Sequence, residues 1–134
     1  MIVGIGTDLC DARRIEAAIA RHGERFAQRV LGEDELAVYR QRQAAHALRA
    51  VRYLATRLAA KEAFSKAIGL GMTGPMNWRA CQALNDEHGR PVIRLGGELA
   101  AWFESRQWRA HVSLTDEGDY AQAFVVIETQ PTST

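Results

Sequence analysis

The segment from Arg57 to Ala67 carries the acidic and basic side chains whose spacing best suits chemistry. Glu62 and Lys66 are four residues apart, so they would be neighbours on one face of a helix. The simplest interpretation is an exposed ion pair worth about a few tenths of a kcal/mol. Small alanine side chains alongside that face would instead let a ligand approach closely. In that case Glu62 suits a metal ion, and Lys61 and Lys66 suit phosphate oxygens.

Asp8 is a second carboxylate with two possible roles. It follows Gly4-Ile5-Gly6-Thr7 and precedes an amphipathic helical pattern, so its side chain could cap a helix by accepting backbone N–H bonds. Alternatively, it could bind a hard cation at a strand-to-helix junction, because Mg²⁺ takes one or two carboxylates and completes its shell with water and phosphate oxygens. The two glycines alone do not indicate a dinucleotide-binding fold, since Leu9 stands where the third glycine would be.

Two other features could bind anions. The loop Gly69-x-Gly71 follows the segment with Glu62 and could offer backbone N–H groups to the same anion. Between Leu36 and Lys61 every charged residue is basic. That stretch is either a solvated helical face or a local positive field for phosphate or an acidic partner.

A basic strip is predicted near the N-terminus. Arg14 and Arg21 are seven residues apart and share one face of the first predicted helix, with Arg25 nearby. The strip is either solvated surface or a docking site for an acidic helix.

Composition excludes several classes of protein. The chain has 134 residues, 47% of them hydrophobic and 25% charged, which is typical of one globular domain over 1–134. A net charge of +1 argues against a general nucleic-acid-binding protein. Apolar runs too short to cross a bilayer, and an N-terminus without a signal-peptide pattern, predict a cytoplasmic protein with no membrane partner. Cys10, Cys81 and the four histidines show no spacing typical of disulfide frameworks or metal ligands.

The elements that must position these residues are predicted to be strands and helices in the order β-α-α-α-β-β-α-β-β. Strands are expected at about 1–5, 78–84, 91–95, 109–114 and 120–128. Helices are expected at about 9–22, 24–31, 35–68 with a break between 41 and 49, and 98–106. This order predicts an α+β fold in which helices pack on a largely antiparallel sheet, with a frayed tail at 129–134.

Taken in order, these segments resemble the holo-[acyl-carrier-protein] synthases, the small 4′-phosphopantetheinyl transferases. The N-terminal match is Ile5-Gly6-Thr7-Asp8 with Arg14-Ile15, followed by 26–31 with Glu35. The most specific match is Lys61-Glu62-Ala63-x-x-Lys66-Ala67. Further matches at 86–91, 111–115 and 121–128 extend the resemblance over nearly the whole chain.

The resemblance implies an enzyme that moves 4′-phosphopantetheine from coenzyme A to a serine of apo-acyl carrier protein in fatty acid biosynthesis, releasing adenosine 3′,5′-bisphosphate. It implies Mg²⁺ ligands at Asp8 and Glu62, with Lys66 at the transferred phosphate. Glu62 and Lys66 are then the catalytic residues, with the serine proton going to Glu62 or to a metal-bound water.

The resemblance also assigns binding residues and partners. It places the basic strip opposite the acidic carrier protein, and it implies a homotrimer with the active site between subunits. The positions assigned to coenzyme A are Arg57, Lys61, Lys66, Gly69, Ser113 and Thr115.

One position departs from the family pattern. Many members have histidine after Ser-x-Ser/Thr, whereas this chain has Ser113-Leu114-Thr115-Asp116. An ionised Asp116 cannot donate to a phosphate, so that contact with coenzyme A must be lost or supplied by another residue. Two other functions fit the same residues: a non-catalytic module that binds an acidic helix, and another Mg²⁺-dependent phosphotransferase or phosphatase.

Overall fold

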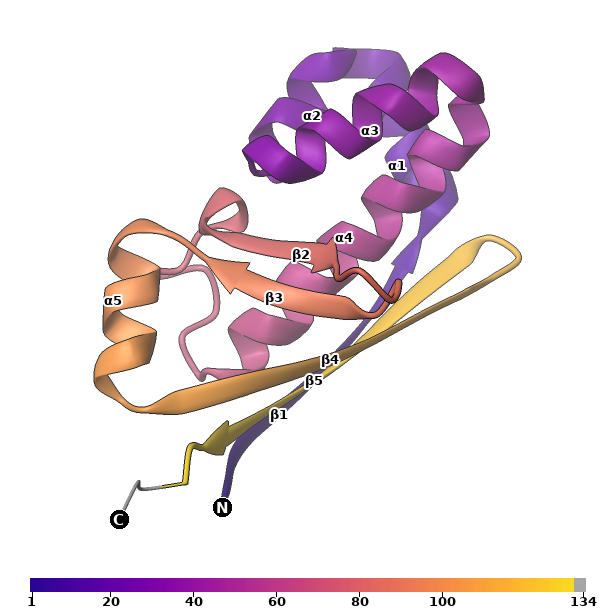
Figure 1. Ribbon diagram of the computed structural model, residues 1–134. Helices are drawn as coiled ribbons and strands as arrows, with labels where there is room; N and C mark the ends of the chain where they lie inside the picture. Colours follow the sequence, from indigo (N-terminus) through magenta and orange to yellow (C-terminus); the bar gives the residue numbers. More distant parts are fainter. Residues whose placement is uncertain (132–134) are drawn as a thin grey trace.

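Two antiparallel sheets pack around one long helix in the computed structural model, which describes residues 1–131 (Figure 1). The three-stranded sheet has the order β1-β5-β4, with β1 at Ile2–Asp11, β5 at Tyr120–Thr129 and β4 at Trp108–Glu117. A separate hairpin joins β2 (Cys81–Asn85) to β3 (Pro91–Leu95). The predicted α+β fold with antiparallel strands is confirmed, but the strands form two sheets and not one.

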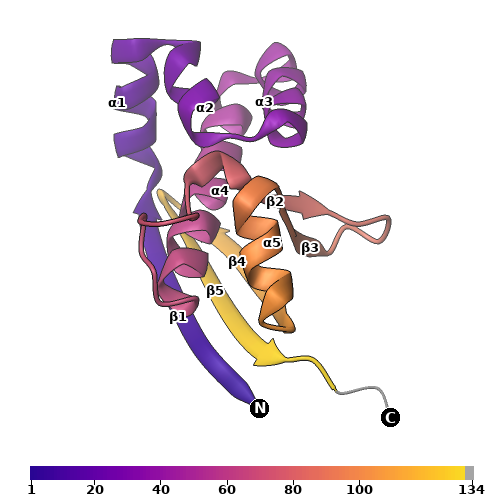
Figure 2. The ribbon, with the colours of Figure 1, turned by 90° about the vertical axis from the view of Figure 1, so that its left-hand side faces the viewer.

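Within the described residues, five helices and one 3₁₀ turn complete the fold. The helices α1, α2 and α3 gather at one end of α4, and α5 lies beside the hairpin (Figure 2). No helix within residues 1–131 is both long and apolar enough to cross a membrane. Their bounds are α1 Ala12–His22, α2 Glu24–Val30, α3 Glu33–Ala45, α4 Ala47–Ala67, η1 Trp78–Ala80 and α5 Gly97–Ser105.

The predicted start of the first helix near residue 9 is wrong, because β1 continues to Asp11 in register with β5. The residue that caps α1 is Asp11, whose Oδ1 accepts from the Arg13 amide at 2.9 Å. Asp8 is therefore a strand residue, and its possible role as a helix cap is excluded. Ladder pairing of nine β1 residues with β5 outweighs the low strand propensity of the two glycines.

The glycines of β1 let the strand lie directly on α4. A Cβ atom at Gly4 would overlap the Ala67 carbonyl oxygen, and one at Gly6 would overlap the Ala63 carbonyl oxygen. Close contact between these backbones fixes where the side chain of Asp8, two residues further along, meets the helix.

We expect Gly6→Ala to lower the free energy of unfolding by about 2–3 kcal/mol, because β1 must move away from α4 to admit the methyl group. Thermal and urea unfolding would measure this loss. Gly96→Ala is the matched control, since a Cβ there meets no atom within 4 Å. Equal stability of the two variants would contradict this account of the β1–α4 contact.

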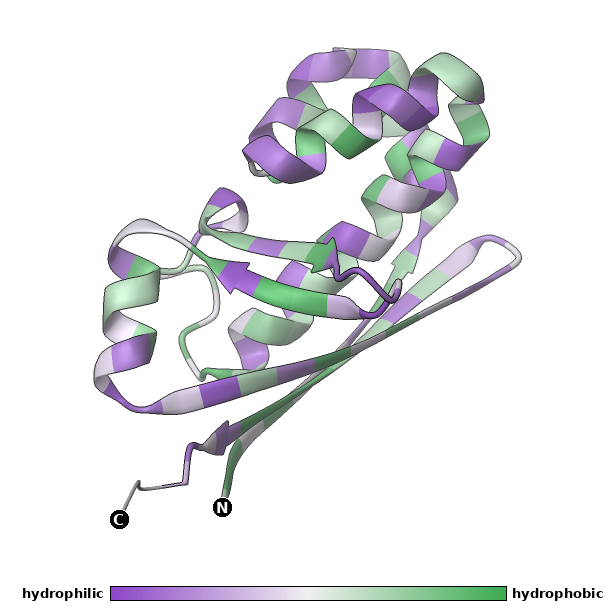
Figure 3. Cartoon of the chain, in the orientation of Figure 1, coloured by the Kyte–Doolittle hydropathy of each residue, from purple (hydrophilic) through white to green (hydrophobic). Residues whose placement is uncertain are grey.

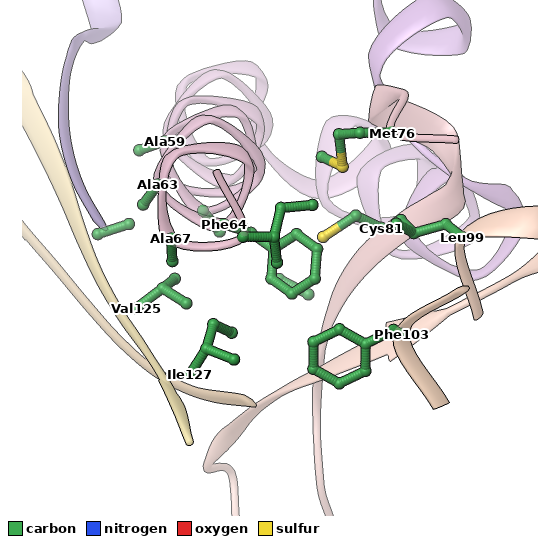
Figure 4. Close-up of a cluster of buried hydrophobic side chains, with 14 residues drawn as sticks. Ala59, Ala63, Phe64, Ala67, Met76, Cys81, Leu99, Phe103, Val125 and Ile127 are labelled. Atoms are coloured by element: carbon green, nitrogen blue, oxygen red, sulfur yellow. The ribbon is translucent and has the colours of Figure 1, made fainter. Parts of the chain in front are cut away.

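The helix α4 contributes its N-terminal half to one cluster of the hydrophobic core and its C-terminal half to another. On one side it packs against the three-stranded sheet and α5, and Figure 4 shows Ala59, Ala63 and Ala67 on the side of the helix that faces the sheet. Phe64 lies 5.7 Å from Phe103, measured between ring centroids. The suggestion that small side chains leave room for a ligand is wrong for these alanines, because they are buried and leave room for β1 instead.

Two other predictions concern chain breaks and the tail. The expected break in the long helical segment is confirmed at His46, whose Nδ1 accepts from the Leu48 amide at 3.2 Å. The expected fraying is wrong at its start: the Thr129 amide donates to the Met1 carbonyl at 2.9 Å, and the Gln130 amide donates to the Gln107 carbonyl at 2.7 Å. The remainder of the predicted tail, 132–134, lies outside the described residues.

Candidate active site

Asp8 and Lys66 meet where β1 crosses the last turns of α4. The Lys66 ammonium lies 3.4 Å from Asp8 Oδ1 and donates to the Thr7 carbonyl at 3.0 Å. Because strand residues alternate between faces, Asp8 points to the same side of β1 as Gly6, toward the helix. Glu62 lies one helical turn before Lys66, so the strand and the helix bring together all three predicted side chains.

Asp8 and Glu62 line the same cleft. This cleft has a volume of about 450 Å³ and lies between β1, α1, α2 and α4. Arg14 and Trp78 contribute polar groups to it, and the rest of its wall is formed by Leu9, Cys10, Ile15, Ala18, Phe26 and Leu58. An acidic pair thus lies in a largely apolar wall with an arginine from the basic strip.

The electrostatics of the cleft favour a cation. Burial raises the pKa of Asp8, and the negative charge of Glu62 adds to that increase, while the hydrogen bond from Lys66 acts in the opposite direction. Two carboxylates that repel each other would be stabilised by a divalent ion between them. Residues 1–131 contain no group of three or more His, Cys, Asp or Glu able to hold a metal. A pair of carboxylates fits Mg²⁺, which fills its remaining positions with water and phosphate oxygens.

Glu62 has a partner that the sequence analysis missed. The indole Nε1–H of Trp78 donates to Glu62 Oε1 at 3.0 Å. The prediction placed Trp78 in a strand, whereas it begins the 3₁₀ turn η1 before β2. In the sequence, the contact between Trp78 and Glu62 is indicated only by the presence of a tryptophan in a segment with the pattern of an ordinary strand.

Arg57 lines a different cleft, of about 240 Å³. Its guanidinium donates to the Ala83 carbonyl at 3.0 Å and to Asn85 Oδ1 at 3.2 Å, and lies 4.3 Å from the centre of the Tyr53 ring. These contacts hold the guanidinium rigidly. The other lining residues are Arg42, Arg52, Thr56, Gly89, Pro91, Leu114 and Asp116. Asp116, which departs from the family pattern, therefore lines the same cleft as three arginines.

The expected contact of Lys61 with coenzyme A is wrong. Its side chain has no exposed surface and its ammonium bonds to Glu35 Oε1 at 2.5 Å. The same ammonium donates to the Trp78 carbonyl at 3.0 Å and to the Cys81 carbonyl at 2.6 Å. With its donors occupied by three buried acceptors, Lys61 cannot reach a ligand in the cleft.

The predicted anion loop is also corrected. The Gly69 amide donates to the Lys66 carbonyl and the Gly71 amide to the Ser65 carbonyl, both at 3.1 Å. These amides close the C-terminal end of α4 and are not free for a phosphate. The two glycines are required because their φ angles are +82° and +60°.

Ser113 and Thr115 lie on the exposed face of β4, opposite Leu114 and Asp116. A single chain therefore does not bring them together with Arg57. The basic strip is exposed: Arg14 and Arg21 lie on α1, and Arg25 lies in the first turn of α2. Within residues 1–131 these three arginines form no ion pair with a carboxylate.

Comparison with known proteins identifies the family. The model of the 4′-phosphopantetheinyl transferase superfamily matches residues 4–125. Holo-[acyl-carrier-protein] synthase from Methylibium petroleiphilum is 64% identical over 132 residues, which cover 98% of this chain and 100% of the relative. The chain belongs to the holo-[acyl-carrier-protein] synthases. It is therefore an enzyme, a phosphopantetheinyl transferase.

Solved structures of this family share the fold. The holo-[acyl-carrier-protein] synthase of Neisseria meningitidis aligns with a TM-score of 0.88 and 40% identity, over 96% of this chain and 100% of that chain. The Bacillus anthracis enzyme, solved in complex with CoA (3′,5′-ADP), aligns with a TM-score of 0.80 and 31% identity, over 97% and 99% of the two chains.

Proposed function

We propose that this enzyme transfers 4′-phosphopantetheine from coenzyme A to a serine of apo-acyl carrier protein for fatty acid biosynthesis, and that Asp8 and Glu62 hold Mg²⁺. The observation that carries the proposal is the convergence of two carboxylates and a lysine, from segments far apart in the sequence, beside one cleft. The complex of the Bacillus anthracis relative with CoA (3′,5′-ADP) supports the choice of cosubstrate.

Transfer of a phosphoryl group needs positioning and charge neutralisation more than covalent participation by the protein. When bound, Mg²⁺ supplies positive charge to the pyrophosphate oxygens of coenzyme A. The Lys66 side chain is exposed, and its ammonium contacts the Thr7 carbonyl and Asp8, so it can turn to the transferred phosphate. We assign acceptance of the serine proton to the Glu62 carboxylate, which accepts a single hydrogen bond, from Trp78.

The cleft around Arg57 suits the nucleotide portion of coenzyme A. Arg42, Arg52 and Arg57 supply the positive charge that phosphate groups require, and they compensate for the aspartate at position 116. Arg57 and Glu62 are five residues apart, so their side chains leave α4 about 140° apart around the helix axis. The two clefts therefore open on different sides of the helix.

This separation supports an active site shared between subunits of a homotrimer. Figure 3 shows a hydrophobic N-terminal portion of β1, and the outer face of the three-stranded sheet exposes Ile5, Leu9 and Phe124. An exposed apolar face of this kind favours burial against another copy of the chain. Association through the sheet could join the Asp8 cleft of one protomer to the Arg57 cleft of its neighbour.

We expect Ile5→Asp to convert the trimer to monomers and to abolish transfer, because a buried carboxylate would oppose association. Sedimentation velocity would measure the mass, and Leu48→Asp, which changes an exposed residue on α4 instead, is the control. A wild-type protein that sediments as a monomer while fully active would contradict the shared site.

The basic strip suits the acidic carrier protein. We expect Arg21→Glu to weaken carrier binding about tenfold at low salt and less at high salt, because exposed charges are screened. Coenzyme A binding should be unchanged, since Arg21 does not line either cleft. Titrations with apo-carrier protein at two salt concentrations would measure this difference, with Arg106→Glu, on α5's C-terminal end, as the control. Equal affinities of the wild type and Arg21→Glu for the carrier protein at low salt would contradict the docking role of the basic strip.

Mass spectrometry of apo-acyl carrier protein incubated with this enzyme, coenzyme A and Mg²⁺ tests the proposed reaction. The carrier should gain the mass of phosphopantetheine. Carrier binding without a mass gain would favour the binding module, and transfer from ATP in place of coenzyme A would favour another phosphotransferase.

A further inference from the structure

Trp78 connects the acidic pair to the buried core of the enzyme. Its indole N–H donates to Glu62 Oε1 at 3.0 Å, and its ring lines the same cleft as Asp8 and Glu62. The indole is only a donor, so this hydrogen bond requires an acceptor such as the Glu62 carboxylate. The Glu62 carboxylate accepts no other hydrogen bond within residues 1–131.

The backbone of Trp78 is anchored by the buried ion pair. Its carbonyl accepts from the Lys61 ammonium at 3.0 Å, and that ammonium also binds Glu35 and the Cys81 carbonyl. Glu35 in turn accepts from the Ala83 amide at 2.8 Å, so both ends of the η1–β2 junction are tied to one charged pair. Lys61 and Glu62 are adjacent in α4, one directed into the core and the other into the cleft.

We propose that Trp78 is a positioning residue for Glu62: its indole N–H holds Oε1 and leaves Oε2 directed to the cation, while the Glu35–Lys61 pair holds the indole in place. This inference rests on the proposed function, in which Glu62 is a Mg²⁺ ligand.

Each carboxylate has one hydrogen-bond partner on a neighbouring element. Asp8 is oriented by Lys66, and Glu62 by Trp78. Without the hydrogen bond from Trp78, the Glu62 side chain would be ordered only when it bound the cation. That entropic cost would lower the affinity for the cation. Groups that hydrogen-bond to metal-ligating carboxylates change metal affinity by about tenfold to a hundredfold when removed.

The test measures binding of Mn²⁺ alone, followed by electron paramagnetic resonance of the free ion, for wild type, Trp78→Phe and Trp108→Phe. Phenylalanine keeps an aromatic ring in the cleft but lacks the N–H donor. We expect Trp78→Phe to raise the Kd for Mn²⁺ about tenfold. Trp108→Phe is the matched control, because Trp108 packs edge-on against Trp102 and Phe103, outside the cleft.

A third variant, Glu62→Gln, separates failure of this inference from failure of the proposed function. If Glu62→Gln loses Mn²⁺ affinity while Trp78→Phe binds Mn²⁺ as the wild type does, the positioning role is overturned and the metal site stands. If Glu62→Gln binds Mn²⁺ as tightly as the wild type, the metal site fails, and the inference fails with it.

A measurement on the native indole covers the case in which Trp78→Phe does not fold. In the wild type, the Nε1–H of Trp78 should be protected from hydrogen exchange, and its NMR resonance should shift strongly in Glu62→Ala. The resonances of Trp102 and Trp108 should not move. An unchanged Trp78 resonance in Glu62→Ala would overturn the proposal without any measurement of metal or activity.

Discussion

Replacement of Glu62 by alanine should reduce the rate of phosphopantetheine transfer at least about a thousandfold, which corresponds to about 4 kcal/mol of transition-state stabilisation. The carboxylate is one of two groups proposed to hold Mg²⁺, and it is also the proposed acceptor of the serine proton. Its side chain leaves α4 on the side of the cleft and contacts Trp78, so its loss removes no buried charge.

Kinetics and unfolding together would check this expectation. Initial rates at saturating Mg²⁺ should fall, while the melting temperature and the sedimentation coefficient of Glu62→Ala should match those of the wild type. Glu104→Ala, which removes an exposed carboxylate from α5, is the matched control. Retention of more than a tenth of the wild-type rate by Glu62→Ala would show that this carboxylate is not part of the transfer machinery.

Replacement of Lys61 by methionine should lower the free energy of unfolding by about 3–5 kcal/mol, because it leaves the Glu35 carboxylate buried without a counter-ion. Glu35 would keep hydrogen bonds only from the amides of Gly32 and Ala83. The double variant Glu35→Gln with Lys61→Met should recover part of the loss, since no charge remains unpaired.

Urea unfolding of both variants and of Lys66→Met would measure these differences. Lys66 is exposed, so its replacement should change the free energy of unfolding by less than about 1 kcal/mol. If Lys61 contacted coenzyme A instead, Lys61→Met would unfold like the wild type but raise KM for coenzyme A. That pattern would contradict the buried position of Lys61.

The convergence of Asp8, Glu62 and Lys66 could be predicted from the sequence because it depends on two regular features. A helix places residues four apart on one face, and the resemblance to known transferases pairs that helix with Asp8. The exact setting of Asp8 could not be predicted: the pairing of β1 with β5 as far as Asp11 is a long-range interaction that no local pattern reveals.

Lys61 shows how a functional motif can conceal a structural residue. It continues the spacing of Val51, Leu54 and Leu58, the apolar stripe of α4, and that spacing was the available signal that it faces the core. Its partner Glu35 lies 26 residues earlier, and an acidic residue in the first turn of a helix has an ordinary explanation in the helix dipole. Neither residue by itself indicates a buried ion pair.

Trp78 and the arginine cleft lay beyond sequence reasoning for a different reason. The 3₁₀ turn η1 is capped locally by Asn77, but the hydrogen bonds of Trp78 to Lys61 and Glu62 are tertiary contacts. Arg42 and Arg52 belonged to a basic stretch whose two interpretations were equally open, and only the packing of α3 and α4 against the β2–β3 turn gathers them around Arg57.

Anomalous scattering from a crystal soaked with coenzyme A and Mn²⁺ would test the central claim most directly, namely that Asp8 and Glu62 bind one divalent ion against the pyrophosphate. We predict a single strong peak within coordination distance of a carboxylate oxygen of each residue and of a pyrophosphate oxygen. Bound coenzyme A with no peak at these carboxylates, or with the two side chains directed away from the ion, would contradict the account.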